Sequence, residues 1–163
     1  MDRMLDFARS GPLYLCQPGI ANMVAEAIRY REREQYVLHS YVVMANHVHL
    51  LITPRVEVSG LMRSLKRFTA REANRMLGLT GQSFWQDESY DHSVRAGEFQ
   101  RIARYIEMNP VDAGLAATPE EFPWSSARPI ANRPAGCHPA PLAGLLNLRF
   151  SMPSCPTCRA SQP

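Results

Sequence analysis

The sequence lacks the features that would place it in a membrane or in an oxidising compartment. No apolar run approaches the roughly 20 residues that a membrane-spanning helix needs. The N-terminal segment MDRMLDFARSGP does not contain the apolar core of a signal peptide. Four cysteines are present without framework spacing, so we expect reduced thiols rather than disulfides: Cys16, Cys137, Cys155 and Cys158. These absences predict a cytoplasmic protein with no membrane partner.

The sequence also has no strong excess of charge of either sign. Its 18 Lys and Arg residues against 15 Asp and Glu residues give a net charge of +3, which is only a weak sign of a nucleic-acid partner. The length of 163 residues and the 45% hydrophobic content suit one domain with a substantial core, and no internal repeat is visible. Eight of the 13 prolines follow Phe122. We therefore expect a domain over residues 1–128 and a proline-rich, disordered tail over residues 129–163.

Periodicity predicts a helix followed by a β-hairpin in the first third of the chain. Pro18 is a favoured first helical residue, and apolar residues recur after it at helical spacing, so we expect a helix over residues 18–34. The runs YVLHSYVVM and HVHLLIT are rich in β-formers and are separated by Ala45-Asn46, which is the spacing of a tight hairpin.

Two further helices and a strand are expected in the middle of the chain. Residues 58–77 form a helix with apolar Leu61, Leu65, Phe68 and Met76 on one side and a crowd of positive charges elsewhere. FWQDESYDHSVR has the alternation of a strand exposed on one side. The next segment, AGEFQRIARYIEMNP, reads as a helix that stops near Asn109, because Pro110 disfavours helical geometry in the residue before it.

Two pairs of residues could carry chemistry. His47 and His49 stand at i and i+2 on a strand and so share one face, which suits a metal site, although a histidine on the polar face of a strand is also ordinary. A histidine triad is excluded because position 51 is Leu. Tyr105 and Asn109 lie one helical turn apart on one stripe. Taken singly, they also read as a rim aromatic and a helix terminator.

A small zinc site is a third possibility. Cys155 and Cys158 have CxxC spacing, and Cys137 and His138 precede them, but a long proline-rich gap separates the two pairs. No second CxxC or HxxxH pair is present. This reading is therefore the weakest of the three.

Five motifs occur in an order that resembles a known family. They are MANHVHLLITP, LMRSLKRFTAREANRML, FWQDESYDHSVR, RYIEMNPVDAGL and FPWSSA. In this order, over roughly residues 12–128, they resemble the REP-associated tyrosine transposases. These proteins are members of the single-tyrosine HUH transposase family, where HUH means His, bulky hydrophobic, His.

The resemblance implies an α+β fold in the ferredoxin-like HUH arrangement, with an antiparallel sheet and helices on one side. It implies that His47, His49 and Asn109 are metal ligands and that Tyr105 is the nucleophile of a single-strand DNA transposase or nickase. Since a tyrosine hydroxyl with a pKa near 10 is a poor nucleophile, a divalent cation must polarise the scissile phosphate, and imidazole with an amide oxygen suits Mg²⁺ or Mn²⁺. The product would be a 5′-phosphotyrosine, which conserves the bond energy, so we expect no nucleotide cofactor.

The implied partners are palindromic repeats extruded as single-stranded DNA hairpins, bound by a monomer or a homodimer. Basic side chains are the candidates for contacts with the DNA backbone: Arg63, Lys66, Arg67, Arg71, Arg75, Arg95 and Arg104. The alternative is a domesticated or inactive protein that binds DNA hairpins without cleaving them.

One departure from the family concerns the start of the chain. Family members open with a strand ahead of the segment that resembles DFARSGPLYL, and this chain begins almost directly with that segment. We therefore expect the first strand to be missing and an interior sheet position to be empty, unless another segment such as the C-terminal tail fills it. A version extended upstream is expected to be more soluble and more stable.

Overall fold

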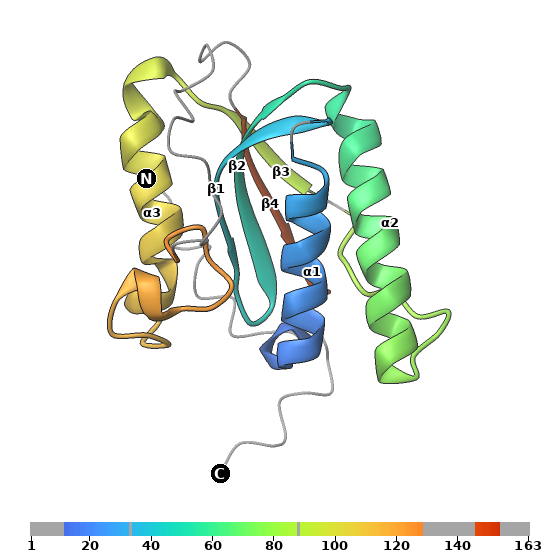
Figure 1. Ribbon diagram of the computed structural model, residues 1–163. Helices are drawn as coiled ribbons and strands as arrows, with labels where there is room; N and C mark the ends of the chain where they lie inside the picture. The colour runs from blue at the N-terminus through green and yellow to red at the C-terminus, as the bar shows by residue number, and fades with distance from the viewer. Residues whose placement is uncertain (1–11, 33, 88, 129–145, 154–163) are drawn as a thin grey trace.

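The computed structural model describes residues 12–32, 34–87, 89–128 and 146–153, which form one layered α+β unit (Figure 1). The α-helices of this part are α1 (Pro18–Tyr30), α2 (Val58–Leu77) and α3 (Phe99–Asp112). The strands are β1 (Tyr36–Val43), β2 (His47–Pro54), β3 (Ser89–Ser93) and β4 (Leu146–Ser151). Short 3₁₀ turns are η1 (Tyr14–Cys16), η2 (Ala96–Glu98) and η3 (Pro119–Glu121).

The four strands form one antiparallel sheet in the order β1-β2-β4-β3. The β1–β2 hairpin turns where the sequence predicted, and Met44 N–H donates to the His47 carbonyl across the turn at 2.8 Å. β4 pairs with β2 on one side and with β3 on the other. The predicted α+β fold with an antiparallel sheet is therefore confirmed.

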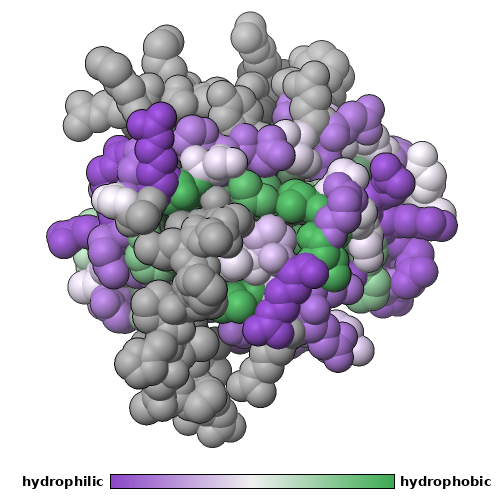
Figure 2. Space-filling model, turned by 90° about the horizontal axis from the view of Figure 1, so that it is seen from above, coloured by the Kyte–Doolittle hydropathy of each residue, from purple (hydrophilic) through white to green (hydrophobic). Residues whose placement is uncertain are grey.

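The helices cover both faces of the sheet, whereas one covered face was expected (Figure 1). α1 and α2 pack on one face around a large core that includes the fully buried Val24, Leu65 and Leu50. α3 packs on the other face over a smaller core that includes Leu51, Ile102 and Ile106. Because successive residues of β2 point to opposite faces, this strand supplies both cores. Figure 2 looks onto the upper end of the molecule, where apolar side chains show between flanking hydrophilic ones.

The first helix ends earlier than predicted, whereas the second has the predicted bounds. α1 begins at Pro18 and stops at Tyr30, where the charged run that follows offers no further apolar face. α2 runs from Val58 to Leu77, with the Glu57 side chain accepting from Ser59 N–H and Gly60 N–H at its start. It ends at Gly78, whose φ of 69° is the left-handed conformation that glycine adopts without a Cβ penalty.

The buried face of α2 differs from the predicted one. Leu61 and Leu65 are buried as expected, but Phe68 and Met76 are exposed on 37% and 46% of their surface. The buried stripe continues instead through Thr69 and Ala73, because a spacing of four residues keeps one face of the helix against the core.

The strand predicted over residues 84–95 is limited to β3 at Ser89–Ser93. The two aromatic residues before it, Phe84 and Trp85, are buried in the larger core instead of lying in the sheet. Trp85 Nε1 donates to Thr69 Oγ1 at 2.9 Å, and its ring packs on Phe150 with centroids 4.7 Å apart. Aromatic side chains favour strands and cores alike, so the alternation was ambiguous.

The prediction that the third helix stops near Asn109 is wrong. α3 continues through Pro110 to Asp112. Pro110 removes one N–H donor, yet Ala113 N–H still donates to the Asn109 carbonyl at 3.0 Å and Leu115 N–H donates to the Pro110 carbonyl at 2.8 Å. Pro110 is itself buried, so packing holds the last turn in helical form despite the preference against it.

The C-terminal segment also differs from its prediction, since residues 146–151 form β4 instead of a disordered tail. β4 lies in the interior of the sheet, between β2 and β3. The expectation of an empty interior position is therefore wrong for this sheet, because a segment of the predicted tail fills it. Residues 129–145 and 154–163 lie outside the described part. The four residues of the zinc-site hypothesis therefore lie outside it too: Cys137, His138, Cys155 and Cys158. Residues 1–11 lie outside it as well. Within the described part, no helix has both the length and the apolar character of a membrane span.

Candidate functional site

The histidine pair lies on the face of the sheet that α3 covers. His47 and His49 are each only 3% exposed. Their rings stand nearly perpendicular, with centroids 4.9 Å apart and an interplanar angle of 87°. Val48 and Leu50, which alternate with them along β2, enter the opposite core. The period of two along a strand therefore brings the two imidazoles together, as the sequence predicted.

The turn before β2 fixes the orientation of His47. Its Nδ1 lies 2.7 Å from Asn46 Oδ1, and because an amide oxygen only accepts, Nδ1 carries the proton and donates. Nε2 is then the nitrogen with the free lone pair, and it is buried without a hydrogen-bond partner among the described residues. Asn46 is tied down in turn, since Met152 N–H donates to its backbone carbonyl at 2.9 Å.

Both imidazoles are held in the neutral form. Burial, with a further contribution from the Arg149 guanidinium, lowers the pKa of His47 to about 3. Burial, then His47, then Arg149 lower the pKa of His49 well below its usual value. A histidine binds a metal through a neutral ring, so the pair is in the ligating form at neutral pH.

α3 brings Tyr105 beside His49 and carries Asn109 one helical turn further on. The Tyr105 ring lies 6.0 Å from that of His49, at an interplanar angle of 82°, and the residue is 38% exposed. Asn109 is 6% exposed, and its Nδ2 donates to the Tyr105 carbonyl at 3.0 Å. Because the amide nitrogen is bonded to the helix, the oxygen is the end of the side chain that would ligate a metal. Tyr105 is thus reachable from solvent while its neighbours are buried.

These residues fit a divalent cation that accepts both nitrogen and oxygen ligands. His47 Nε2, which has no hydrogen-bond partner among the described residues, the neighbouring His49 imidazole and the Asn109 amide oxygen would together make a mixed nitrogen and oxygen donor set. No group of three or more His, Cys, Asp or Glu residues lies together within residues 12–32, 34–87, 89–128 and 146–153. A metal site here would need Asn109 as its third protein ligand, the role that the family resemblance implies for it.

A hydrogen-bonded group of side chains joins α3 to β1 beside this site. Ser126 Oγ donates to Glu107 Oε1 of α3 at 2.9 Å and lies 3.1 Å from Ser40 Oγ of β1. The backbone N–H of Tyr41 also donates to Ser126 Oγ, at 3.0 Å. The FPWSSA segment thereby holds α3, and with it Tyr105, against the sheet.

The candidate DNA-contacting residues fall on two sides of the molecule. Arg63, Arg67, Arg71 and Arg75 are exposed on α2, which lies across the sheet from the histidines. Arg95 and Arg104 are exposed on the side of α3. Lys66 is half-buried, and its ammonium donates to the backbone carbonyls of Gln86 and Asp87 and to Ser89 Oγ. Of the seven residues, Lys66 is therefore the least available for a phosphate.

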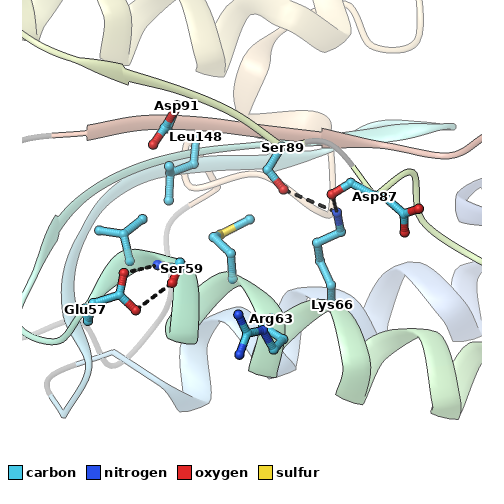
Figure 3. A pocket seen from close by; sticks show the side chains of 10 residues that line it. Glu57, Ser59, Arg63, Lys66, Asp87, Ser89, Asp91 and Leu148 are labelled. Atoms are coloured by element: carbon cyan, nitrogen blue, oxygen red, sulfur yellow. Dashed lines mark hydrogen bonds between the residues drawn. The ribbon is translucent and has the colours of Figure 1, made fainter.

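The α2 side also carries a cleft of about 560 Å³ between the start of α2 and the strands β3 and β4 (Figure 3). Glu57, Asp87 and Asp91 line it together with Arg63 and Lys66, and Leu148 of β4 points into it. The Glu57 carboxylate already occupies the N-terminal end of α2, which disfavours a phosphate there. This cleft is separated by the sheet from the histidines and Tyr105.

Two residues near the histidines were not found by sequence reasoning. Asn46 was interpreted only as a turn residue, although an amide directly before a candidate ligand is a common orienting partner. Arg149 was assigned to the tail, yet it pairs with His49 across β2 and β4. The alternation of Leu146, Leu148 and Phe150 was the signal that this segment is a strand.

The comparison with protein families first gives the class. The family model described as "Transposase IS200 like" matches residues 16–109, which is more than half of the chain and includes both histidines, Tyr105 and Asn109. The protein is thus of the transposase class. More particularly, the chain belongs to the IS200-like transposase family.

A solved structure supports the same assignment at the level of the fold. It is a REP-associated tyrosine transposase bound to a REP hairpin, 20% identical, with a TM-score of 0.53. The match covers 72% of this chain and 68% of that chain. No curated protein matches this sequence. The family and the transposase fold are thereby confirmed.

Proposed function

We propose that this protein is a metal-dependent single-strand DNA transposase or nickase that acts on palindromic repeat hairpins through a 5′-phosphotyrosine. The observation that carries the proposal is the position of Tyr105, a partly exposed tyrosine whose ring lies 6.0 Å from a buried, neutral histidine pair. The family match supports it, and so does the fold shared with a transposase that was solved with a hairpin.

The chain's own residues supply the nucleophile and hold it in place. The Tyr105 hydroxyl attacks the scissile phosphorus, and it loses its proton to solvent as the new bond from oxygen to phosphorus forms. The bond from phosphorus to the 3′ oxygen breaks, and that oxygen takes up a proton. A divalent cation held by His47, His49 and Asn109 would supply charge neutralisation at the phosphate. Strand transfer reverses the attack with another 3′ hydroxyl, so no nucleotide cofactor is consumed.

Binding of the hairpin is assigned to the exposed arginines. Each Lys or Arg contact to a phosphate releases counterions and makes affinity dependent on salt. Arg95 and Arg104 lie on the side of α3, so they would contact the strand that is cleaved. The arginines of α2 lie on the opposite face, so they would contact another part of the DNA. When the two variants are compared at equal hairpin occupancy, Arg104→Ala should therefore show a lower cleavage rate than Arg67→Ala.

The test uses labelled single-stranded hairpin DNA from repeats that flank the gene, with and without Mn²⁺. The wild-type protein should form a covalent adduct that survives denaturation, and Tyr105→Phe should bind the hairpin without forming it. Tyr30→Phe is the matched control, because Tyr30 is 83% exposed on α1 across the sheet. An adduct formed by Tyr105→Phe would show that another residue is the nucleophile.

The metal ligands are tested separately. His49→Ala should lose Mn²⁺-dependent cleavage and keep most of its hairpin affinity, since the arginines supply that affinity. His92→Ala, which removes an exposed histidine of β3, is the control. Undiminished Mn²⁺ binding by a variant with both His47 and His49 replaced by alanine would remove this site from consideration.

The second candidate function is hairpin binding without cleavage. It is favoured by the Arg149 guanidinium, whose positive charge acts on both histidines and so opposes a second cation nearby. The same experiment separates the two functions. A wild-type protein that binds the hairpin in Mn²⁺ and forms no adduct is a binding protein.

A further inference from the structure

The strand β4 brings a charged residue to the histidine face from outside the segment that matches the family. Arg149 stands opposite His49 in the register of β2 and β4, whereas the family match ends at residue 109. Its neighbours Leu148 and Phe150 are buried in the core under α1 and α2. Figure 3 shows Leu148 pointing into the cleft on the α2 side. Because side chains alternate along a strand, Arg149 lies on the other face, with the histidines.

Proximity to the histidines is also visible in the electrostatics. The Arg149 charge contributes to lowering the pKa of both His47 and His49. Antiparallel neighbours lie roughly 4.5–5.5 Å apart between Cα atoms, so a guanidinium on a flexible stem reaches the surroundings of either ring. The residue is half-buried, and its Nε is buried from solvent. A positive charge is therefore built into the wall of the candidate active site.

We propose that Arg149 donates hydrogen bonds to the non-bridging oxygens of the scissile phosphate, so that the C-terminal strand β4 completes the active site. This inference rests on the proposed function. A guanidinium is planar and presents paired N–H donors, which match two oxygens of a phosphate.

A phosphate bound on this face would also lie between Arg149 and a cation held by the histidines. A guanidinium and a divalent cation beside the same two imidazoles repel each other unless a negative group lies between them. The phosphodiester that Tyr105 attacks is the anion that the reaction brings to this position.

The role follows the balance of the reaction. As the Tyr105 oxygen bonds to phosphorus and the 3′ oxygen leaves, negative charge grows on the non-bridging oxygens. Arg149 donors aimed at these oxygens stabilise the transition state more than the bound substrate. The proton of Tyr105 and the proton taken up by the 3′ oxygen are exchanged with solvent, since an arginine keeps its proton.

The test compares wild type with Arg149→Met and Arg149→Lys. Methionine keeps an unbranched stem in the interior strand, and lysine keeps the charge without the planar fork. Arg29→Ala is the control for net charge, because Arg29 is exposed on α1 across the sheet. Four quantities are measured for each protein: the single-turnover rate of adduct formation, the hairpin affinity as a function of salt, the Mn²⁺ affinity and the melting temperature.

We expect Arg149→Met to slow adduct formation by about 100-fold or more, as removal of one transition-state donor does elsewhere. The slope of log affinity against log salt should fall by about 0.7, the value for one phosphate of a single strand that is no longer neutralised. Mn²⁺ affinity should stay equal or rise slightly. Arg149→Lys should slow adduct formation by about tenfold and keep the salt slope.

Three results would overturn the proposal. The first is an unchanged rate in a folded Arg149→Met, and the second is an unchanged salt slope. The third is Mn²⁺ binding that appears only in Arg149→Met, because Arg149 would then occupy the metal position in the wild type. If Arg149→Met does not fold, Arg149→Lys provides the test instead. A wild-type rate of adduct formation in Arg149→Lys would show that the planar guanidinium and its paired hydrogen bonds to the phosphate are not needed. If the wild-type protein forms no adduct, the proposed function is refuted. The difference in salt slope between wild type and Arg149→Met then tests on its own whether Arg149 contacts a phosphate.

Discussion

Replacement of Asn46 by alanine should weaken metal binding without touching a metal ligand. Asn46 Oδ1 lies 2.7 Å from His47 Nδ1, in a position where His47 is only 3% exposed. Loss of this acceptor frees the imidazole to rotate and to exchange tautomers, so Nε2 is no longer held as the ligating nitrogen. Loss of such an orienting partner typically costs 10- to 100-fold in metal affinity, which is about 1.4 to 2.7 kcal/mol.

The same substitution has a second effect that does not depend on metal. The buried Nδ1–H of His47 would lose its acceptor, and an unsatisfied buried donor costs about 1–3 kcal/mol. The metal-free Asn46→Ala protein should therefore unfold at lower urea concentration, by that amount of free energy. Asn46→Asp keeps an acceptor oxygen at the same position and is the matched control.

The assays are Mn²⁺ titration by calorimetry and urea unfolding in the presence of a chelator. We expect Asn46→Ala to show a lower Mn²⁺ affinity and a lower free energy of unfolding. Asn46→Asp should retain or improve Mn²⁺ affinity, because a carboxylate makes the imidazole a stronger ligand. Equal Mn²⁺ affinity in wild type and Asn46→Ala would refute the orienting role. Equal losses in the alanine and aspartate variants would show that the amide acts through the turn instead.

Three further predictions concern the scaffold that supports the site. Ile106→Ala, at a fully buried position of the smaller core, should lower the free energy of unfolding by about 2–5 kcal/mol in urea titrations; a smaller loss would mean that α3 settles into the cavity. Burial raises the pKa of Tyr36, whose hydroxyl donates to the Ile28 carbonyl, so the folded protein favours the neutral phenol. The stability that this phenol contributes is complete below a pH of about 10 and is lost as the pH rises above that value. Tyr36→Phe should therefore be less stable than wild type at pH 7 by about 1 kcal/mol and show a shallower alkaline decline, and parallel curves would contradict the assignment. A chain ending at Arg128 should be insoluble, or unfolded as judged by circular dichroism. It loses the buried Leu148 and Phe150, and it exposes the edges of β2 and β3. A folded, monomeric fragment would contradict an interior place for β4.

Elements with local signals were predictable from the sequence. α2 has its predicted bounds, since an apolar periodicity ends at Gly78, the residue type that suits the left-handed end of a helix. The hairpin before His47 and the pairing of two imidazoles on one face follow from a period of two and a short turn. Tyr105 and Asn109 were found by helical spacing, and the approach of Tyr105 to His49 was expected only from the family resemblance.

Features that depend on contacts between distant segments were not predictable in the same way. Pro110 stays helical because it is buried, and its burial depends on the sheet and on the chain beyond the helix. Periodicity cannot show which face of the sheet each helix covers, because an amphipathic pattern predicts only which side of the helix is buried. β4 pairs with β2 over about one hundred residues of sequence, and prolines on both sides concealed its alternation.

The place of β4 in the sheet couples the completion of the fold to the chemistry of the site. Any strand between β2 and β3 must direct alternate side chains to the core under α1 and α2, and Leu148 and Phe150 do so. The remaining side chains of that strand then necessarily face α3 and the histidines, which is how Arg149 comes to stand opposite His49. A different segment in this position would preserve the sheet but bring another residue beside the imidazoles. In this chain the residue opposite His49 is an arginine, and under our proposal that arginine completes the active site.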